Sequence, residues 1–206
     1  VVQSREGLPA HKEPFAHDHA PVPDFLSAVQ ALKPTAIIGV SGQTGKFDKQ
    51  VLQTMAEINE QPIIFSLSNP TSKSECTASE AYTWTQGRCL FASGSPFDPV
   101  TIDEKTFTPG QGNNAYIFPG IGLGVIASQA KLVTESMFLA AAKTLASQVS
   151  EADFGSGLLY PPLNTIRQIS LHIAIAVAEL AFEEGLARVQ RPEDITVFIK
   201  SQMFEP

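Results

Sequence analysis

The sequence predicts an α/β fold in which helices cover both faces of a parallel sheet. Three short apolar runs of strand length are separated by segments with the 3.6-residue period of amphipathic helices. A helix between two strands forms a crossover connection, and such connections make the strands parallel. From Ala115 onward the chain is mainly helical. We therefore expect half of a doubly wound sheet with a helical tail packed against it.

The first two helix and strand pairs lie before residue 70. Apolar residues between positions 25 and 32 recur at helical spacing until Pro34 interrupts them, and the run "TAIIGV" that follows predicts a buried strand. The segment "FDKQVLQTMAEIN" repeats the helical period, and "PIIFSL" predicts the second strand.

The third helix begins near Thr77, because the Thr77 to Glu80 spacing is that of a capping box. Its strand is "CLFASG", and the stretch "VTIDEKTFTPG" beyond it suits a small hairpin or an extended excursion. Further helices are predicted at Glu135–Val149, at Ile166–Glu184, and from Pro192 to about Met203.

Composition narrows the classes of partner. The chain has 206 residues, 43% of them hydrophobic, which is enough for a sizeable core. A net charge of −7 without any Lys/Arg run argues against nucleic acid as a partner, and no apolar run approaches membrane-spanning length. We therefore expect neither nucleic acid nor a membrane as a partner.

Cys76 and Cys89 form no CxxC pattern, which favours a reduced compartment. Because the chain starts at Val1 in mid-pattern, we expect it to be a piece of a longer protein.

Candidate ligand sites lie at the carboxyl ends of the predicted strands, where loops of a parallel sheet meet. The loop "GVSGQTG" after the first strand has glycines at 39, 42 and 45, which allow backbone to approach a ligand and lead into a helix N-terminus. From this pattern alone, a glycine turn without any dinucleotide is an equally good interpretation.

Asparagines follow two other segments. Asn69 ends the second strand, and Pro70 restricts its backbone and so the direction of its carboxamide. Asn113 and Asn114 follow a glycine in "PGQGNNAYIFPG". On the pattern alone, an ordinary turn is the favoured interpretation of both stretches.

The histidines and Cys76 are weaker candidates for a functional site. His17 and His19 lack a nearby third ligand, so a zinc site there is rejected in favour of a solvated loop. His172 lies in a helical run and suits a packed or surface position. Cys76 beside a helix start suits a packed thiol better than a reactive one.

Five motifs occur together and in order, and they resemble malic enzymes of the large-subunit type. They are "LSNPTSKSECTASEAY", "CLFASGSPFDPV", "PGQGNNAYIFPG", "LYPPLNTIR" and "SQMF". The resemblance covers essentially all of Val1–Pro206 but only the C-terminal part of the family's subunit. It implies a Rossmann-like sheet that lacks its first strands, with a partial NAD(P)-binding domain at 1–130 and a helical segment at 131–206 packed on it.

The resemblance implies oxidative decarboxylation of L-malate to pyruvate and CO2 with NADP+, or NAD+, and Mg2+ or Mn2+. In the family the catalytic tyrosine and lysine, the phosphate-binding glycine fingerprint and the three carboxylate metal ligands lie upstream of the segment that matches Val1. We therefore expect no catalytic residue and no metal ligand in this chain, and no activity from the chain alone.

The same resemblance implies binding residues. Asn69 and Asn113 match asparagines that contact malate, Asn114 adjoins them, and Asn69 also lies near the nicotinamide.

Ser41, Gly42 and Gln43 match a loop that borders the cofactor ribose, although Gln43-Thr44 departs from the small residues of many relatives. Lys12 matches a position at which NADP-using animal members carry lysine, which favours NADP+ because a cation suits a 2′-phosphate.

An alternative remains open: a truncated, non-catalytic module whose role is structural or oligomeric. We expect a cytoplasmic protein, with a mitochondrial or plastid location as the alternative, because family members in different compartments differ mainly in N-terminal segments. The resemblance also implies a homo-oligomer for the full-length protein.

Overall fold

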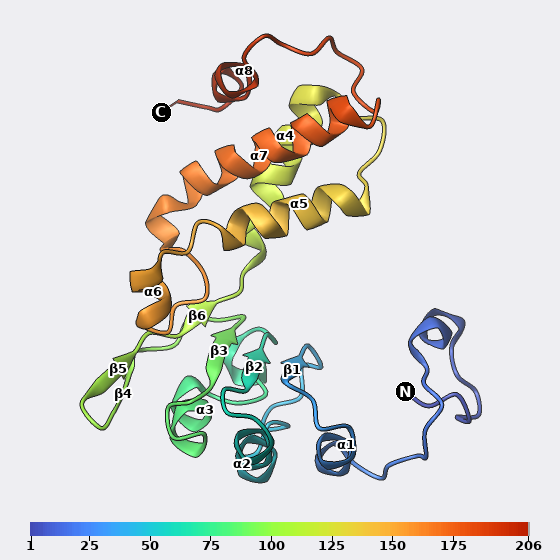
Figure 1. Ribbon diagram of the computed structural model, residues 1–206, viewed down its shortest axis with the longest axis vertical. Helices are drawn as coiled ribbons and strands as arrows, with labels where there is room; N and C mark the ends of the chain where they lie inside the picture. The colour runs from blue at the N-terminus through green and yellow to red at the C-terminus, as the bar shows by residue number, and fades with distance from the viewer. Residues whose placement is uncertain (206) are drawn as a thin grey trace.

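The computed structural model describes residues 1–205 and contains a parallel sheet of four strands in the order β1-β2-β3-β6 (Figure 1). The strands are β1 (Ala36–Gly39), β2 (Ile63–Ser66), β3 (Leu90–Ser93) and β6 (Gly110–Gln111). Each pairs in parallel with its neighbour, with Ile37 opposite Ile64 and Ile64 opposite Phe91. The predicted fold class is therefore confirmed.

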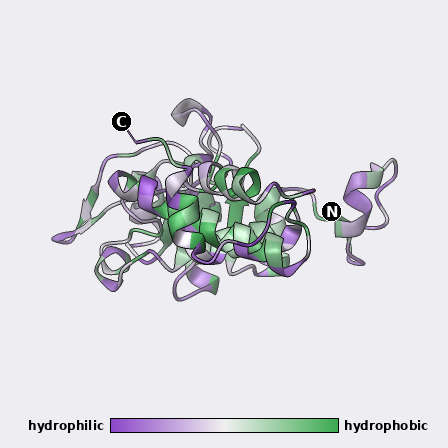
Figure 2. Cartoon of the chain, turned by 90° about the horizontal axis from the view of Figure 1, so that it is seen from above, coloured by the Kyte–Doolittle hydropathy of each residue, from purple (hydrophilic) through white to green (hydrophobic). Residues whose placement is uncertain are grey.

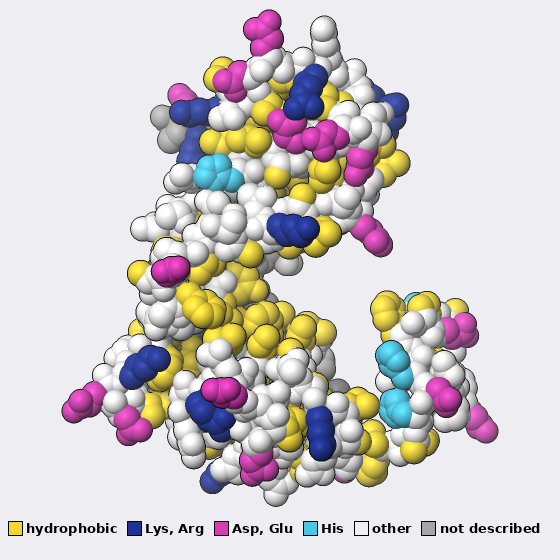
Figure 3. Space-filling model, in the orientation of Figure 1, with side chains coloured by type: hydrophobic (Ala, Val, Ile, Leu, Met, Phe, Trp, Pro, Cys, Tyr) yellow, Lys and Arg dark blue, Asp and Glu magenta, His cyan; other side chains and the backbone are white. Residues whose placement is uncertain are grey.

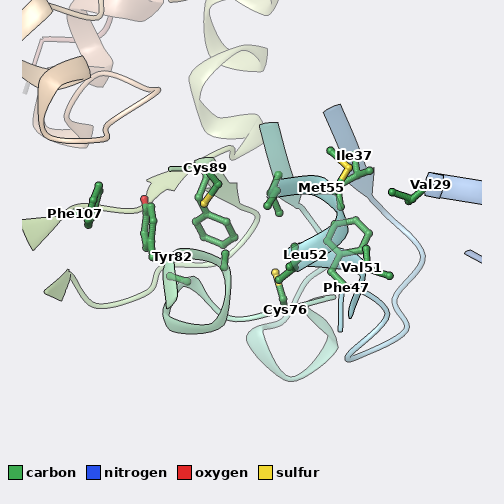
Figure 4. Packing of buried hydrophobic residues seen from close by; sticks show 14 residues of the cluster. Val29, Ile37, Phe47, Val51, Leu52, Met55, Cys76, Tyr82, Cys89 and Phe107 are labelled. Carbon is green, nitrogen blue, oxygen red and sulfur yellow. The ribbon is translucent and has the colours of Figure 1, made fainter. Parts of the chain in front are cut away.

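Helices α1 (Phe25–Leu32), α2 (Lys49–Ile58) and α3 (Ala78–Trp84) cover one face of the sheet. Their apolar stripes meet the row formed by Ile37, Ile64 and Phe91 in one buried cluster (Figure 4). Burying side chains of this size stabilises the fold by about 1.5–3 kcal/mol each. The predicted capping box at Thr77 starts α3, with both of its hydrogen bonds present.

A second layer lies on the other side of the strands and consists mainly of α4 (Phe118–Ser128), α5 (Glu135–Ala146) and α7 (Ile166–Glu183). Helix α4 approaches α7 closely, because a Cβ added at Gly120 would lie 2.6 Å from the Cβ of Ile173. The layer has its own buried clusters, and Figure 2 shows hydrophobic segments gathered in the middle of the molecule.

In contrast to the expectation from the sequence, the span Leu163–Glu183 is long and apolar enough to cross a membrane by length and composition. However, seven residues of α7 within it are buried, and the helix packs against both α4 and α5. We interpret α7 as the core helix of its layer, since a buried core helix has the same composition.

The remaining elements lie in the connections between these helices and strands and near the two ends of the chain. They are η1 (Ala10–Phe15), η2 (Thr71–Lys73), the antiparallel hairpin β4 (Val100–Ile102) and β5 (Lys105–Phe107), η3 (Asn114–Tyr116), α6 (Glu151–Gly155), η4 (Leu163–Thr165) and α8 (Ile195–Ser201). The N-terminal segment with η1 lies apart from the sheet in Figure 1.

Two elements differ from the sequence prediction. The pattern suggested a hairpin or an excursion after Pro96, and the structure forms the hairpin and then adds β6 as a fourth parallel strand. A two-residue strand has no periodicity, so its pairing with β3 is visible only in three dimensions. Helix α8 begins at Ile195 rather than near Pro192, because Asp194 accepts a hydrogen bond from the Val197 amide and caps the helix there.

Candidate functional site

The four parallel strands end at one edge of the sheet, and the predicted binding residues follow three of them. The Ser41 loop follows β1, Asn69 follows β2, and Asn113 follows β6. Carboxyl ends of parallel strands are where ligands bind in open α/β sheets. The fold thus brings the loops of three separate motifs to one edge.

The carboxamide of Asn69 is held by the loop that follows β3. Ser95 Oγ donates a 2.6 Å hydrogen bond to Asn69 Oδ1, and Asn69 Nδ2 lies 3.5 Å from the Leu67 carbonyl oxygen. Asn69 is exposed whereas Ser95 is buried, and the Asn69-Pro70 peptide is cis. A Cβ at Gly94 would lie 2.7 Å from Asn69 Nδ2, so glycine is required for this approach.

Asn113 and Asn114 line a pocket of about 440 Å³ between the sheet edge and the helical layer. Its other walls are apolar and come from both layers: Phe65, Leu67, Gly112, Ile117, Ala142, Leu145, Ala146, Leu159 and Tyr160. In Figure 3 hydrophobic side chains gather where the two layers meet. The Oδ1 of Asn113 accepts a hydrogen bond from the Ala115 amide, and Asn114 is exposed.

Three consecutive amides of the loop after β1 donate to side chains, two of them to the buried Glu75 and Ser68 and one to Ser41. The Ser41 N–H donates to Glu75 Oε1 at 3.1 Å, the Gly42 N–H to Ser68 Oγ at 2.9 Å, and the Gln43 N–H to Ser41 Oγ at 3.3 Å. Because these donors are already used, the loop does not offer them to a phosphate. What the loop presents outward is its side chains.

These side chains border a second pocket, of about 380 Å³. Its lining includes Ser41, Gln43, Glu75 and the cation Lys46. The N-terminus of α2, which follows the loop, is already capped, because Asp48 accepts a hydrogen bond from the Val51 amide. The pocket therefore combines hydroxyl, amide and charged groups with an apolar wall.

Glu75 is the buried charge of this region, with only 1% of its surface exposed. Burial by itself would raise its pKa, but hydrogen bonds from the Ser68 hydroxyl, its own backbone and Ser41 outweigh that effect and lower the pKa below the ordinary value. The side chain is therefore a carboxylate at neutral pH.

The other candidates lie elsewhere. Lys12 is half-buried on η1, in the N-terminal segment, and does not line either pocket. The His19 ring lies 2.8 Å from the Ala20 carbonyl oxygen. Within residues 1–205, no three His, Cys, Asp or Glu side chains gather into a possible metal site.

Cys76 and Cys89 are both buried and free, as the packed interpretation requires. His172 Nδ1 lies 2.9 Å from Gln148 Oε1, so this histidine packs between helical-layer segments.

Three residues of the site were missed by the sequence analysis: Glu75, Ser68 and Ser95. Each is an ordinary loop residue in the sequence, and the signal that distinguishes it is burial beside another chain segment. Only Ser68 could have been suspected from the sequence, because it directly precedes Asn69, a predicted binding residue.

The fold and this edge define an open α/β domain of the kind that binds ligands beyond the carboxyl ends of its strands. The family model described as "Malic enzyme, NAD binding domain" matches residues 1–182, so the chain belongs to the malic enzyme family. That family is enzymatic, and its recognition from the motifs is confirmed.

Three related proteins align with this chain over its whole length. NADP-dependent malic enzyme 3 of Arabidopsis thaliana is 55% identical over 207 residues, covering 100% of this chain and 35% of the relative. The NADP-dependent malic enzyme of Vitis vinifera is 55% identical with the same coverage, and a chloroplastic one from Oryza sativa subsp. japonica is 55% identical with 33% of its length covered. The chain thus spans about a third of the length of these relatives.

Solved structures match as well. Malic enzyme from Pyrococcus horikoshii Ot3 superposes with a TM-score of 0.60 at 29% identity, over 81% of this chain and 34% of that one. Entamoeba histolytica malic enzyme gives 0.64 at 24% identity, over 81% and 31%, which supports the fold alone.

Proposed function

We propose that the chain is the C-terminal cofactor- and substrate-binding part of an NADP-preferring malic enzyme, which converts L-malate to pyruvate and CO2. The observation that carries this proposal is the meeting of the Ser41 loop, Asn69 and Asn113 at one sheet edge. Relatives named NADP-dependent malic enzyme, alike over the full chain, support it.

In this proposal the amides of Asn69 and Asn113 bind the substrate. Asn69 has its oxygen engaged by Ser95 and one N–H of Nδ2 directed at the Leu67 carbonyl oxygen, which leaves the second N–H of Nδ2 to donate to a malate carboxylate or hydroxyl oxygen. Asn113 has its oxygen engaged by the Ala115 amide, which leaves its own Nδ2 for the same task. Both asparagines therefore act as donors, which suits an anionic substrate.

The second pocket suits part of a nicotinamide dinucleotide. Ser41 Oγ donates its hydrogen to Glu75 and can still accept a bond from a ribose hydroxyl, the Gln43 carboxamide offers both a donor and an acceptor, and Lys46 adds a cation. The nucleotide supplies the hydride acceptor when bound, and the residues of this chain hold and orient it. No step is assigned to a metal held by residues 1–205, since they contain no metal-ligand cluster.

Binding is the first test. Calorimetric titration of the chain with NADP+ and with NAD+ is expected to show tighter binding of NADP+. The absence of binding of both nucleotides at millimolar concentration would instead favour the structural or oligomeric module. That alternative has its own support, because Ile38, Ile126 and Leu139 expose 62%, 74% and 56% of their surface.

Two matched variants locate the source of the NADP+ preference. Lys46→Gln removes the cation that lines the pocket, whereas Lys12→Gln removes the one on η1. One of these lysines is expected to face the 2′-phosphate of NADP+. Replacing that lysine should lower the ratio of NADP+ affinity to NAD+ affinity about tenfold, which is a loss of about 1.4 kcal/mol of binding free energy. An unchanged ratio in both variants would contradict a lysine-based preference.

Activity belongs to the complete subunit, which we propose to be a homo-oligomer. Its assay follows NADPH formation with L-malate, NADP+ and Mg2+ or Mn2+, and the chain alone is expected to be inactive. For location we propose the cytoplasm, with the plastid as the alternative that the chloroplastic relatives support.

A further inference from the structure

Glu75 is a buried carboxylate whose side-chain partners are hydrogen-bond donors from the loops after β1 and β2 and from Ser66, the last residue of β2. Within residues 1–205 it forms no ion pair with a Lys or Arg side chain. A buried charge without a counter-ion is costly unless hydrogen bonds replace its hydration. The donors that compensate Glu75 are therefore a required part of this region.

The two carboxylate oxygens accept hydrogen bonds from residues at the ends of both β1 and β2. Oε1 accepts from Ser41 N at 3.1 Å, from Ser41 Oγ at 3.1 Å and from Ser68 Oγ at 2.5 Å. Oε2 accepts from Ser66 Oγ at 3.2 Å and from Ser68 N at 3.4 Å. Through Ser68 Oγ, the network also reaches the Gly42 amide. One side chain thus joins the loop after β1 to the end of β2.

The strand itself is shaped for this side chain. A Cβ added at Gly39, the last residue of β1, would lie 2.5 Å from Glu75 Cδ and 2.7 Å from Oε2. Only a residue without a side chain leaves room for the carboxylate at that point. Because Gly39 leaves this space, the Glu75 carboxylate lies next to the Ser41–Gln43 loop, which begins two residues after Gly39.

We propose that Glu75 is a positioning residue that fixes the Ser41–Gln43 loop in its cofactor-binding conformation. The inference rests on the proposed function, because it takes NADP+ as the ligand of that loop. Glu75 also lines the second pocket beside Ser41 and Gln43, so a change in its hydrogen bonds alters the wall that meets the nucleotide.

The test compares Glu75→Gln with Glu80→Gln in the complete subunit. Glutamine keeps the shape of Glu75 but turns an N–H group toward donors that need an acceptor. Glu80 undergoes the same chemical change five positions along, at the capping box of α3. We expect Glu75→Gln to raise the KM for NADP+ about tenfold and to leave the KM for malate within twofold, while Glu80→Gln changes neither.

A variant with a smaller change guards against misfolding of Glu75→Gln. Ser68→Ala removes the hydroxyl that links Glu75 to Gly42 and is expected to raise the KM for NADP+ severalfold. Combined with Glu75→Gln, it should add less than its separate effect, because both changes break one network. A well-folded Glu75→Gln protein whose KM for NADP+ stays within twofold would overturn the proposal.

Amide hydrogen exchange separates this inference from the proposed function, since it needs no ligand. Faster exchange at Ser41, Gly42 and Gln43 in Glu75→Gln than in the unsubstituted protein supports the positioning role even if NADP+ does not bind. Equal exchange rates at these amides overturn it. Failure of the unsubstituted protein to bind NADP+ counts against the proposed function alone.

Discussion

Ser95 Oγ donates a 2.6 Å hydrogen bond to Oδ1 of Asn69. The bond joins the loop after β3 to the loop after β2, so the direction of the Asn69 amide is set by a neighbouring strand. Without this bond the carboxamide keeps only the long contact of Nδ2 with the Leu67 carbonyl oxygen, at 3.5 Å, so its oxygen and nitrogen exchange places more easily.

We therefore predict that Ser95→Ala weakens malate binding. Losing one orienting hydrogen bond is worth about 1 kcal/mol, so the KM for malate in the complete subunit should rise about five- to tenfold. The KM for NADP+ should stay within twofold. Ser128→Ala is the matched control, because Ser128 is also buried but donates to the Gly124 carbonyl oxygen within α4. An equal rise in both variants would refute the orienting role.

The glycines of α4 give a second prediction, on stability. A Cβ at Gly120 would lie 2.6 Å from the Ile173 Cβ, and one at Gly124 would lie 2.7 Å from the Ala174 carbonyl oxygen. Gly120→Ala and Gly124→Ala should therefore each reduce the free energy of unfolding by about 1–3 kcal/mol.

Gly122 lies between them with nothing within 4 Å of an added Cβ. Gly122→Ala should stabilise the protein by up to about 1 kcal/mol, because alanine is the better helix former. Thermal or denaturant unfolding of the three variants checks the sign of each effect. Destabilisation by Gly122→Ala would mean that α4 meets a further surface in solution.

The cysteines give a third prediction. Burial raises the pKa of Cys89 to about 11 and raises that of Cys76 further, so neither is a thiolate at neutral pH. Both thiols should resist a disulfide reagent in the folded protein and react together with it after denaturation. Rapid reaction of one thiol in native buffer would contradict the packing of its cluster.

The pH dependence of stability follows from Glu75. Its pKa in the folded protein lies below the ordinary value of 4.5, because the hydrogen bonds outweigh burial. A lowered folded pKa stabilises the protein above the unfolded pKa, and this contribution is lost as the pH falls through the folded value.

We therefore expect Glu75→Gln to be less stable than the unsubstituted protein at pH 7 and the difference to shrink below about pH 4.5. The neighbouring Cys76 stays neutral over this range because burial raises its pKa. Unfolding curves of both proteins at several pH values measure the difference. If the stability difference between the two proteins persisted to pH 2, Glu75 would not be the group responsible for it.

The sequence predicted the fold where periodicity is strong. The helices α2 and α7, the three longer strands and the capping box at Thr77 all lie where apolar spacing and polar caps indicated them. The β6 strand was missed because two residues carry no period.

For the site, the motifs indicated the asparagines and the Ser41 loop, whose ligand roles stay predictions. They did not indicate the side chains that hold these groups. Glu75 is recognisable only once Gly39 is seen to leave room for it, and Ser95 only once β3 lies beside β2. Contacts between distant segments leave no local pattern in one sequence.

The buried clusters of the two layers share no residue. Two layers unfold together only when breaking the contacts of one layer destabilises the other. Layers with separate buried clusters depend on each other less in this way. We expect the amides of α7 and of β2 to exchange through different opening reactions, each with its own free energy. The pocket lined by Asn113 lies between these two units, so it is the part of the molecule whose shape changes when either unit opens.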